Sequence, residues 1–369
     1  MRKKILFLMP QDISVPTYGT AVIAKNLINY FSKRNEIHVI YMTKNSFSRN
    51  LNVHVENAIR IKYSDLGYFI FSPTMYNSAK KLMKKIDFDF IFLNTLNAGI
   101  CGTLLSRIFF TPMVYYSHNV EYMRHLDLAK NDPRRCLFVP IFYLVEKICC
   151  KKAFLTLAIT ENDKKTLEKW SDNVVITPGG FNAEVYHPFY KINKNNTPIV
   201  LFFGDFDYLP NREAAYLIRD RILESVIREC PNIKFLIIGN NPPKDISNPN
   251  IEVKGAVRNI VEFIRRADVV INPVVRGGGI RMKIIESLAC GKTVISTVKG
   301  ASGISHTFRN LKLGKLEEFP SLIFETIRKE NPVNSEDYAL LKNDYAFQNI
   351  LPRLERNIDL SLNMMNKNN

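Results

Sequence analysis

The sequence has no hydrophobic run long enough to cross a bilayer. Its most apolar stretch, Leu137 to Val145, spans nine residues, whereas a membrane-spanning helix needs about 20. The chain begins Met-Arg-Lys-Lys, as some secretory signals do, but the apolar run that follows ends at Met9 without a small-residue cleavage site. Signal peptides carry about 7–15 apolar residues at this point. We therefore expect a buried first strand and a cytoplasmic protein.

The residue spacings of metal-binding and disulfide-rich proteins are also lacking. The six cysteines include no CxxC pair, and the six histidines show neither HxxxH nor HExxH spacing. Structural zinc sites and zinc proteases rely on such spacings. We expect reduced thiols and no bound metal.

Acidic residues are too few to balance the basic ones, and the formal net charge is +16. Such an excess favours an anionic partner, which is nucleic acid, acidic lipid or a phosphorylated substrate. Basic side chains concentrate at two places in the first half. They are Lys80, Lys81, Lys84 and Lys85, and then Arg134, Arg135, Lys147, Lys151 and Lys152. No nucleic-acid-binding motif is present, which leaves a solvated basic face or contact with an anionic membrane surface.

Length and patterning predict two α/β domains. A chain of 369 residues fits two domains of roughly 150–200 residues each. Almost continuously apolar runs alternate with helix-period segments, as in parallel sheets covered on both faces. Strands are predicted at 4–9, 37–42, 88–94, 113–117, 155–159 and 174–177, and again at 199–203, 234–238, 251–254, 269–273 and 293–297. Helices are predicted at 20–32, 211–229, 260–266 and 281–290.

A turn-rich break separates the two halves. Pro178-Gly179-Gly180 ends one strand, and the polar segment 186–198 follows. We predict an N-terminal, acceptor-side domain over 1–183 and a nucleotide-binding domain over 184–344. Both are doubly wound parallel sheets, and ligands of such sheets bind beyond the carboxyl ends of the strands. Those ends are expected to face a cleft.

The most informative segment runs from Arg276 to Gly291. Gly277, Gly278 and Gly279 lead from a strand into a helix predicted to begin near Ile280. Backbone N–H groups at such a helix start, free of Cβ atoms, form a site for a phosphate or a sugar hydroxyl.

Cationic side chains occupy the first turn of this predicted helix. Arg281 and Lys283 oppose the helix dipole there, which indicates that an anion is expected. Glu286 follows and could accept hydrogen bonds from a ribose diol. The alternative is a glycine-rich turn with a solvated basic helix.

Residues 272–297 resemble the donor-site signature of family-four retaining glycosyltransferases, the glycosyl transferases group 1, which have the GT-B fold. The signature is carried by Lys283, Glu286 and the Ala-Cys-Gly-Lys that ends at Lys292. Other pieces agree in order and spacing, over nearly all of residues 170–305. They are Val175–Asn182 with Tyr186-His-Pro188, Leu201–Asn211, Phe235–Gly239, Val253–Val257 and Gly300–Ile304.

The first half resembles the family more loosely. Tyr18-Gly19-Thr20 is similar to its glycine-containing loop near the donor phosphates, and Ser117 to Glu121 is similar to its histidine loop. The resemblance implies that His118 is catalytic; by itself it would be read as a capping or core histidine. For the donor diphosphate and sugar it implies Gly19, Thr20, Gly204, Gly277, Gly278, Gly279, Ile280, Arg281 and Lys283. For the nucleoside it implies Val257 and Glu286.

Two departures from the family pattern matter. The family commonly has a sugar-contacting Glu eight residues before Glu286, where this chain has Gly278. The identity of the donor sugar therefore does not carry over. The Arg and Lys that grip the diphosphate after the Gly204 strand are replaced by Asp205 and Asn211, so Arg281 and Lys283 are expected to take that role.

The resemblance implies retaining transfer of a sugar from a UDP- or GDP-linked donor to a saccharide or lipid-linked acceptor. A role in cell-envelope polysaccharide synthesis at the inner face of the membrane is expected, without a metal cofactor and without nucleic acid. The final helix, about 345–363, is expected to cross back onto the N-terminal domain. Two alternatives stay open: a non-catalytic nucleotide- or saccharide-binding module, and a sugar-nucleotide epimerase of the same fold.

Overall fold

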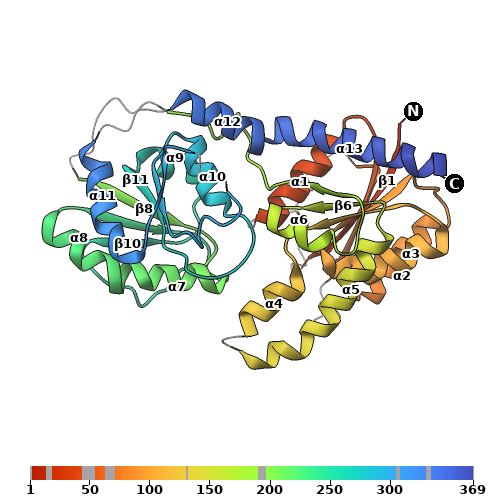
Figure 1. Ribbon diagram of the computed structural model, residues 1–369, viewed down its shortest axis with the longest axis horizontal. Coiled ribbons are helices and arrows are strands. Elements are labelled where there is room, and N and C mark those ends of the chain that lie inside the picture. Colours follow the sequence, from red (N-terminus) through yellow and green to blue (C-terminus); the bar gives the residue numbers. More distant parts are fainter. Residues whose placement is uncertain are drawn as a thin grey trace. The chain divides into compact units, whose positions relative to one another are not determined.

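The chain folds into two α/β units (Figure 1). The computed structural model describes residues 2–13, 19–43, 55–62, 71–129, 132–189, 197–304, 308–329 and 334–368. The first unit comprises Met1–Gly179 with Leu351–Asn369, and the second comprises Gly180–Ile350.

The boundary between the units falls inside the Pro-Gly-Gly turn rather than at residue 183. The reason is Phe181, which is buried in the core of the second unit. Its N–H donates to the Tyr345 carbonyl at 2.9 Å, and its own carbonyl accepts from the Phe347 N–H at 3.0 Å. The same contacts keep Tyr345 and Ala346 in the second unit, so the return to the first unit begins at Leu351.

The described residues of the first unit form a seven-stranded parallel sheet in the order β3-β2-β1-β4-β5-β6-β7. The strands are β1 (Lys4–Met9), β2 (Glu36–Thr43), β3 (Asn57–Lys62), β4 (Phe90–Asn94), β5 (Met113–Ser117), β6 (Leu155–Ala158) and β7 (Val174–Ile176). Every strand predicted in this half forms. The strand order reverses between β1 and β4, and ligands of such sheets bind at that point.

Strand β3 escaped prediction because it is an exposed edge strand. Only Ile61 is buried in it, and Ile59 is partly buried. Ala58, Arg60 and Lys62 alternate with these and are exposed, so the segment lacks the continuous apolar run of the central strands.

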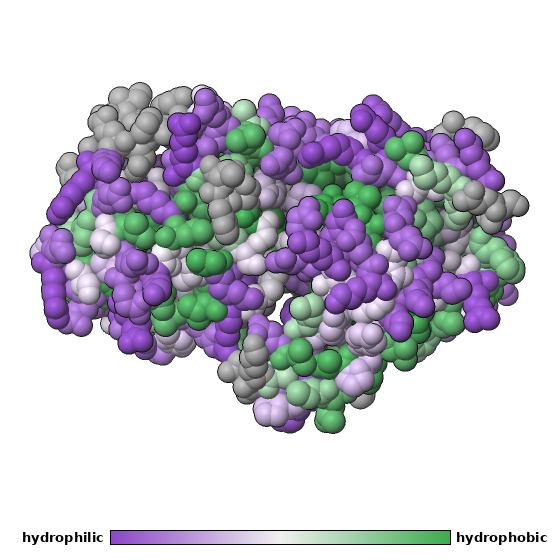
Figure 2. Space-filling model, in the orientation of Figure 1, coloured by the Kyte–Doolittle hydropathy of each residue, from purple (hydrophilic) through white to green (hydrophobic). Residues whose placement is uncertain are grey.

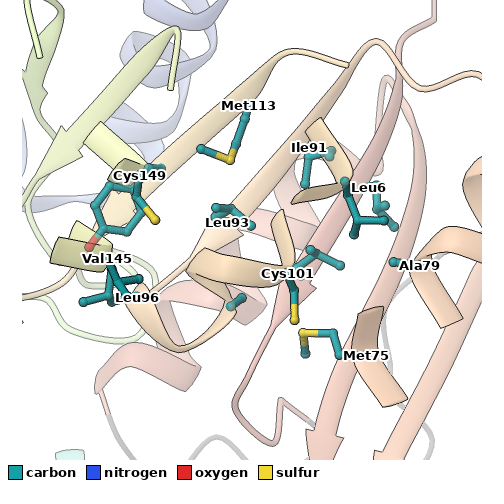
Figure 3. Packing of buried hydrophobic residues seen from close by; sticks show 14 of the residues in the cluster. Leu6, Met75, Ala79, Ile91, Leu93, Leu96, Cys101, Met113, Val145 and Cys149 are labelled. Atoms are coloured by element: carbon teal, nitrogen blue, oxygen red, sulfur yellow. The ribbon is translucent and has the colours of Figure 1, made fainter. Parts of the chain in front are cut away.

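Helices cover this sheet, and their buried faces make a continuous core. They are α1 (Gly19–Phe31), α2 (Pro73–Met83), α3 (Gly99–Phe109), α4 (Glu121–Ala129), α5 (Val139–Lys152) and α6 (Glu161–Leu167), with short 3₁₀ turns η1 (Leu96–Ala98) and η2 (Pro133–Phe138). Figure 3 shows Leu93 of β4 and Met113 of β5 packed with Cys101 of α3 and Cys149 of α5. All six cysteines are free, as the lack of pairing motifs predicts.

The second unit contains a six-stranded parallel sheet in the order β10-β9-β8-β11-β12-β13. The strands are β8 (Ile199–Phe203), β9 (Lys234–Ile238), β10 (Ile251–Lys254), β11 (Val269–Asn272), β12 (Val294–Ser296) and β13 (Leu311–Leu313). The order reverses between β8 and β11, which again defines a ligand-binding edge. The helices are α7 (Leu209–Leu217), α8 (Leu223–Glu229), α9 (Ile260–Arg266), α10 (Met282–Ala289), α11 (Phe319–Arg328) and α12 (Ser335–Tyr345).

The helix predicted over 211–229 is interrupted. It forms as α7 and α8, joined by one π-helical stretch at Ile218–Ile222. A π-helical turn contains one extra residue, which the pattern of apolar residues along the sequence does not reveal.

The last helix, α13 (Phe347–Asn368), returns to the first unit from Leu351 onward. There Lys3 pairs with Asp359 at 2.7 Å, and the Tyr30 hydroxyl donates to Glu355 at 2.7 Å. This is the crossing helix that the family resemblance implies. It continues past Asn363, where the polar composition suggests disorder. Within the ranges that the structure describes, no helix is both long and apolar enough to cross a membrane.

Gly239 brings the end of β9 against the loop after β8. Its φ is +154°, and a Cβ at this position would lie 1.7 Å from the Gly204 carbonyl oxygen. The Gly204 N–H in turn donates to the Ile238 carbonyl at 3.0 Å. Only a residue without a side chain lets these two loops approach so closely.

We predict that Gly239→Ala lowers the free energy of unfolding by about 2–4 kcal/mol, because the new methyl group meets backbone that cannot move independently. Gly255→Ala is the matched control, since nothing lies within 4 Å of its Cβ position. That variant should stay within about 0.5 kcal/mol of the wild type. Urea unfolding of both proteins tests this, and equal stability of the two variants would contradict it.

Candidate functional site

In the second unit, the loop after β8 and the start of α10 meet around the side chain of Lys283. Its ammonium donates to the Asn211 side-chain oxygen at 2.9 Å and lies 4.2 Å from the centre of the Phe202 ring. A Cβ on Gly204 would lie 3.0 Å from the Lys283 nitrogen. Gly204 therefore leaves the space that the ammonium occupies.

Lys283 is held in an unusual electrostatic state. The side chain is 8% exposed, and burial, with the nearby charge of Arg281, holds the pKa of its ammonium well below the usual range. Its hydrogen bond goes to a neutral amide, and the Phe202 ring adds only a cation–π contact. A bound anion would favour the charged form, so the site is suited to a phosphate group.

The glycine loop before α10 is shaped by left-handed backbone. Gly277 has φ +95° and Gly279 has φ +76°, values that side chains other than glycine rarely adopt. A Cβ on Gly277 would lie 2.3 Å from the Tyr208 hydroxyl. The loop after β11 thus packs directly on the loop after β8.

Arg281 braces this loop from within. Its guanidinium donates to the carbonyl oxygens of Gly278 and Arg276, the latter at 3.2 Å, and lies 5.5 Å from the centre of the Tyr208 ring. The sequence predicts a phosphate-binding role for Arg281, and the structure adds a loop-bracing role.

Helix α10 begins at Met282, two residues after the predicted start near Ile280. Gly279 has a φ of +76°, and Arg281 has a φ of −91° and a ψ of 94°. Neither residue is in the helical region. Arg281 precedes the helix and provides no side-chain cap. Uncapped N–H groups at a helix start attract anions, and Lys283 lies in this first turn.

Glu286 follows Lys283 by three residues and is half-buried. Burial raises the pKa of its carboxyl to about 7, against the opposing effects of a hydrogen bond from Tyr186 and the charge of Lys283. Tyr186 belongs to the segment 186–188 that resembles the family, but its contact with Glu286 was not predicted. Val257 is half-buried against the apolar cluster that holds the inner face of α10.

A cavity of about 540 Å³ opens at the carboxyl ends of β11, β12 and β13. Its lining includes Val275, Thr297, Lys299 and Lys315, and none of the predicted site residues. It borders the glycine loop only through Val275. The candidate anion site is therefore defined by the contacts of Lys283 rather than by this cavity.

In the first unit, His118 follows β5 and is buried, with 6% of its surface exposed. Its Nε2 lies 2.8 Å from the side-chain oxygen of Asn94, and its ring centre lies 4.2 Å from that of Tyr116. Burial lowers the pKa of the imidazole to about 3. Burial therefore favours the neutral imidazole at physiological pH, which can make hydrogen bonds but carries no charge.

Asn94 is a site residue that the sequence did not reveal. It ends β4, and β4 and β5 are neighbours in the sheet. Its amide is fully buried, and its nitrogen has no hydrogen-bond partner among the residues described. The only signal in the sequence was a polar residue at the end of an apolar strand.

Two further residues of the first unit, Gly19 and Thr20, are predicted from the sequence to contact the donor diphosphate. Gly19 and Thr20 begin α1 and are half-buried, while Tyr18 lies outside the described residues. His125 is buried and stacks on Phe142 with ring centres 4.1 Å apart, so it is part of the packing between α4 and α5.

The loop that carries His118 is anchored by Glu146 of α5. One carboxyl oxygen accepts from the Tyr115 hydroxyl at 3.2 Å and from the Glu121 N–H at 3.2 Å. Burial, and secondarily the charge of Glu121, raises the pKa of Glu146 to about 8. The side chain thus caps the start of α4 in its protonated form at neutral pH.

Solved structures with this architecture have the GT-B fold. The chain resembles Anabaena HepE in complex with UDP-glucose, with a TM-score of 0.73 and 15% identity over 97% of this chain and 100% of that one. It resembles sucrose-phosphate synthase of Thermosynechococcus elongatus with a TM-score of 0.75 and 16% identity over 96% and 98%. The class is therefore that of two-unit GT-B proteins.

Family models narrow this class. The model of Glycosyltransferase Family 4 matches residues 17–185, and the model of Glycosyl transferases group 1 matches residues 197–315. The chain therefore belongs to the glycosyltransferase family that these two models describe. An uncharacterized glycosyltransferase of Methanocaldococcus jannaschii is 24% identical over 311 residues, which are 80% of each chain.

The contacts of Lys283 predict a role in binding rather than in stability. Lys283→Met should weaken binding of UDP or GDP by about 10- to 100-fold, because a charge-assisted hydrogen bond to phosphate is lost. The variant should not melt earlier than the wild type, since the buried ammonium that is removed has only the neutral Asn211 amide as its hydrogen-bond partner among the described residues. Calorimetric titration and thermal melting measure both effects.

Lys292→Met provides the matched control. Lys292 is also buried, but its ammonium donates to the carbonyl oxygens of Arg265 and Ala267, each at 2.8 Å. This variant should lose stability and keep its nucleotide affinity. The opposite pattern in the two variants would refute the assignment of Lys283.

The raised pKa of Glu146 predicts that the stability of the protein depends on pH. Because its pKa rises from 4.5 to about 8 on folding, the folded state keeps a proton that the unfolded state loses. The contribution of this proton to the free energy of unfolding is complete below pH 4.5 and is lost as the pH rises through 8. Glu146→Gln cannot ionise, so its stability relative to the wild type should grow between pH 5 and pH 9 by roughly 2–5 kcal/mol. Parallel urea-unfolding curves at all pH values would contradict this.

Proposed function

We propose that the enzyme is a retaining, hexosyltransferase-like glycosyltransferase that uses a UDP- or GDP-linked sugar. The observation that carries the proposal is the buried ammonium of Lys283 beside Gly204, which has a neutral hydrogen-bond partner and a lowered pKa. Such a group is stabilised by an anion, and the leaving diphosphate of a sugar nucleotide is one. Anabaena HepE, a similar structure, was solved with UDP and with UDP-glucose.

The proposed donor site lies in the second unit. Lys283, Arg281 and the N–H groups at the start of α10 stabilise the diphosphate as it departs, which lowers the barrier electrostatically. Gly204 and the glycines at 277–279, with Ile280, line the path of the diphosphate and sugar. Glu286 receives the ribose hydroxyls, and the side chain of Val257 contacts the base.

In the first unit, on the acceptor side, His118 is proposed as the catalytic residue. A neutral imidazole held by Asn94 can hydrogen-bond a hydroxyl of the donor sugar or of the acceptor. Gly19 and Thr20 are proposed to approach the diphosphate.

The acceptor is proposed to be a saccharide or a lipid-linked saccharide in cell-envelope polysaccharide synthesis, at the inner face of the cytoplasmic membrane. The excess positive charge of the chain supports a location at an anionic surface. The similar structures include WaaG, a glycosyltransferase involved in lipopolysaccharide biosynthesis.

Transfer is proposed to need no metal ion, because Arg281 and Lys283 provide cationic charge at the diphosphate. A non-catalytic binding module and a sugar-nucleotide epimerase are the competing functions. Each predicts a different fate of the donor, so one assay separates them.

The test begins with thermal-shift screening of nucleotide sugars, followed by incubation of the best donor with saccharide acceptors. We expect transfer with retention of the anomeric configuration, observed by NMR, and an unchanged rate in EDTA. His118→Ala should lower kcat by about 100-fold or more with little change in nucleotide affinity.

Other outcomes would reject the proposal. Binding without turnover on any donor would indicate a binding module, and isomerisation of the donor without transfer would indicate an epimerase. An inverted product would contradict the retaining mechanism, and loss of activity in EDTA would contradict metal independence.

A further inference from the structure

Helix α5 is apolar on its outer face as well as on its inner one. Phe142, Val145 and Cys149 are buried in the core, and an ordinary surface helix would be polar on the opposite side. Here that side carries Ile141, Leu144 and Ile148 instead. They are 40%, 56% and 40% exposed.

These exposed positions form one stripe. Leu137, in the 3₁₀ turn η2 just before α5, is 74% exposed, and the spacing 141, 144 and 148 places those three residues of α5 on one helical face. Helix α4, which packs beside α5, adds Met123 and Leu126, at 48% and 53% exposure. We call these six residues the apolar ridge.

Helix α3 extends the apolar surface on the other side of α5, which it also contacts. Leu104 and Ile108 are 40% and 47% exposed, and Phe110 at the end of the helix is 92% exposed. In Figure 2, hydrophobic residues gather at the tip where α4 and α5 meet. Contiguous apolar surface of this kind marks a binding surface.

Basic side chains flank the ridge along the chain. Arg107 on α3 and Lys151 and Lys152 at the end of α5 are exposed. Arg134 and Arg135, just before the stripe, share the single carboxylate of Asp132. The surroundings of the apolar ridge are therefore cationic.

An aromatic cluster lies at the edge of the ridge. The rings of Tyr122, Tyr143 and Trp170 lie with their centres 5.1–5.7 Å apart. Lys147 lies 5.9 Å from the centre of the Tyr143 ring. Tyr and Trp with an apolar body and a polar edge are the residues enriched at the boundary between lipid and water.

We propose that the apolar ridge inserts into the interface of an anionic lipid bilayer. Apolar side chains ringed by cations suit such a surface, because burial and charge attraction then add. A second copy of the chain is disfavoured, because a symmetric pairing would bring the two basic rims together. The inference deepens the proposed use of a lipid-linked acceptor, and it names the surface that holds the enzyme at the membrane.

The test uses the full chain and vesicles of phosphatidylcholine, with or without about one-third phosphatidylglycerol. Flotation should recover the protein with the anionic vesicles. Leu137→Asp combined with Leu144→Asp should weaken this binding at least tenfold, because the inserted side chains become charged. Leu209→Asp combined with Leu340→Asp is the control, since these residues of the second unit are 46% and 49% exposed and lie outside the ridge.

Trp170 is the only tryptophan in the chain, and its ring packs on that of Tyr122, the residue before Met123 of the ridge. Its emission should shift to shorter wavelength with anionic vesicles, and brominated lipid should quench it. Neither effect should occur in the Leu137→Asp, Leu144→Asp variant, whose circular dichroism and melting temperature verify that it is folded.

Three results would overturn the proposal. They are no binding to anionic vesicles, binding that the ridge variant retains, and a dimer in analytical ultracentrifugation that the ridge variant dissociates. The ridge variant should still bind the nucleotide and hydrolyse the donor slowly in solution. Vesicle binding without any turnover of a donor would reject the proposed function and leave the membrane surface standing.

Discussion

In the second unit, the loops after β8 and β11 pack around the buried ammonium of Lys283. Burying a charge costs free energy unless an anionic partner offsets it, and here the hydrogen-bond partner is the neutral amide of Asn211. The cost appears as a lowered pKa and is relieved when an anion binds. The close approach of Gly239 to Gly204, and of Gly277 to Tyr208, brings the two loops together around this group.

In the first unit, burial favours the neutral form of the titratable side chains near the loop after β5. Burial holds His118 deprotonated and Glu146 protonated near neutral pH. Neither side chain then carries a charge into the apolar end of the sheet, and each still makes hydrogen bonds that order the loop after β5. An imidazole with so low a pKa can hydrogen-bond a ligand without gaining a charge between pH 5 and pH 8.

Helix α5 joins this loop to the molecular surface. Its inner face supplies Glu146, which caps α4, and its outer face supplies Ile141, Leu144 and Ile148. Contiguous exposed apolar side chains on the outer face of a helix indicate a binding surface. Contact with a bilayer would use this surface within one turn of the residues that anchor the His118 loop.

Sequence patterns alone located β1, β5, β8, β9, β10 and α9 to the residue, because long apolar runs with clear turns leave few alternatives. They also predicted a donor site at the glycine loop, Lys283 and Glu286, because the spacing of these residues along the chain is local. Edge strand β3 escaped because most of its residues are exposed, and edge strand β13 escaped because it has only three residues and is half-exposed. Asn94, Glu146 and Tyr186 escaped because their partners are 24, 25 or more residues away in the chain. Only the tertiary structure decided which of these polar groups are buried together, since burial and pairing, rather than residue type, set their pKa values and hence their chemistry.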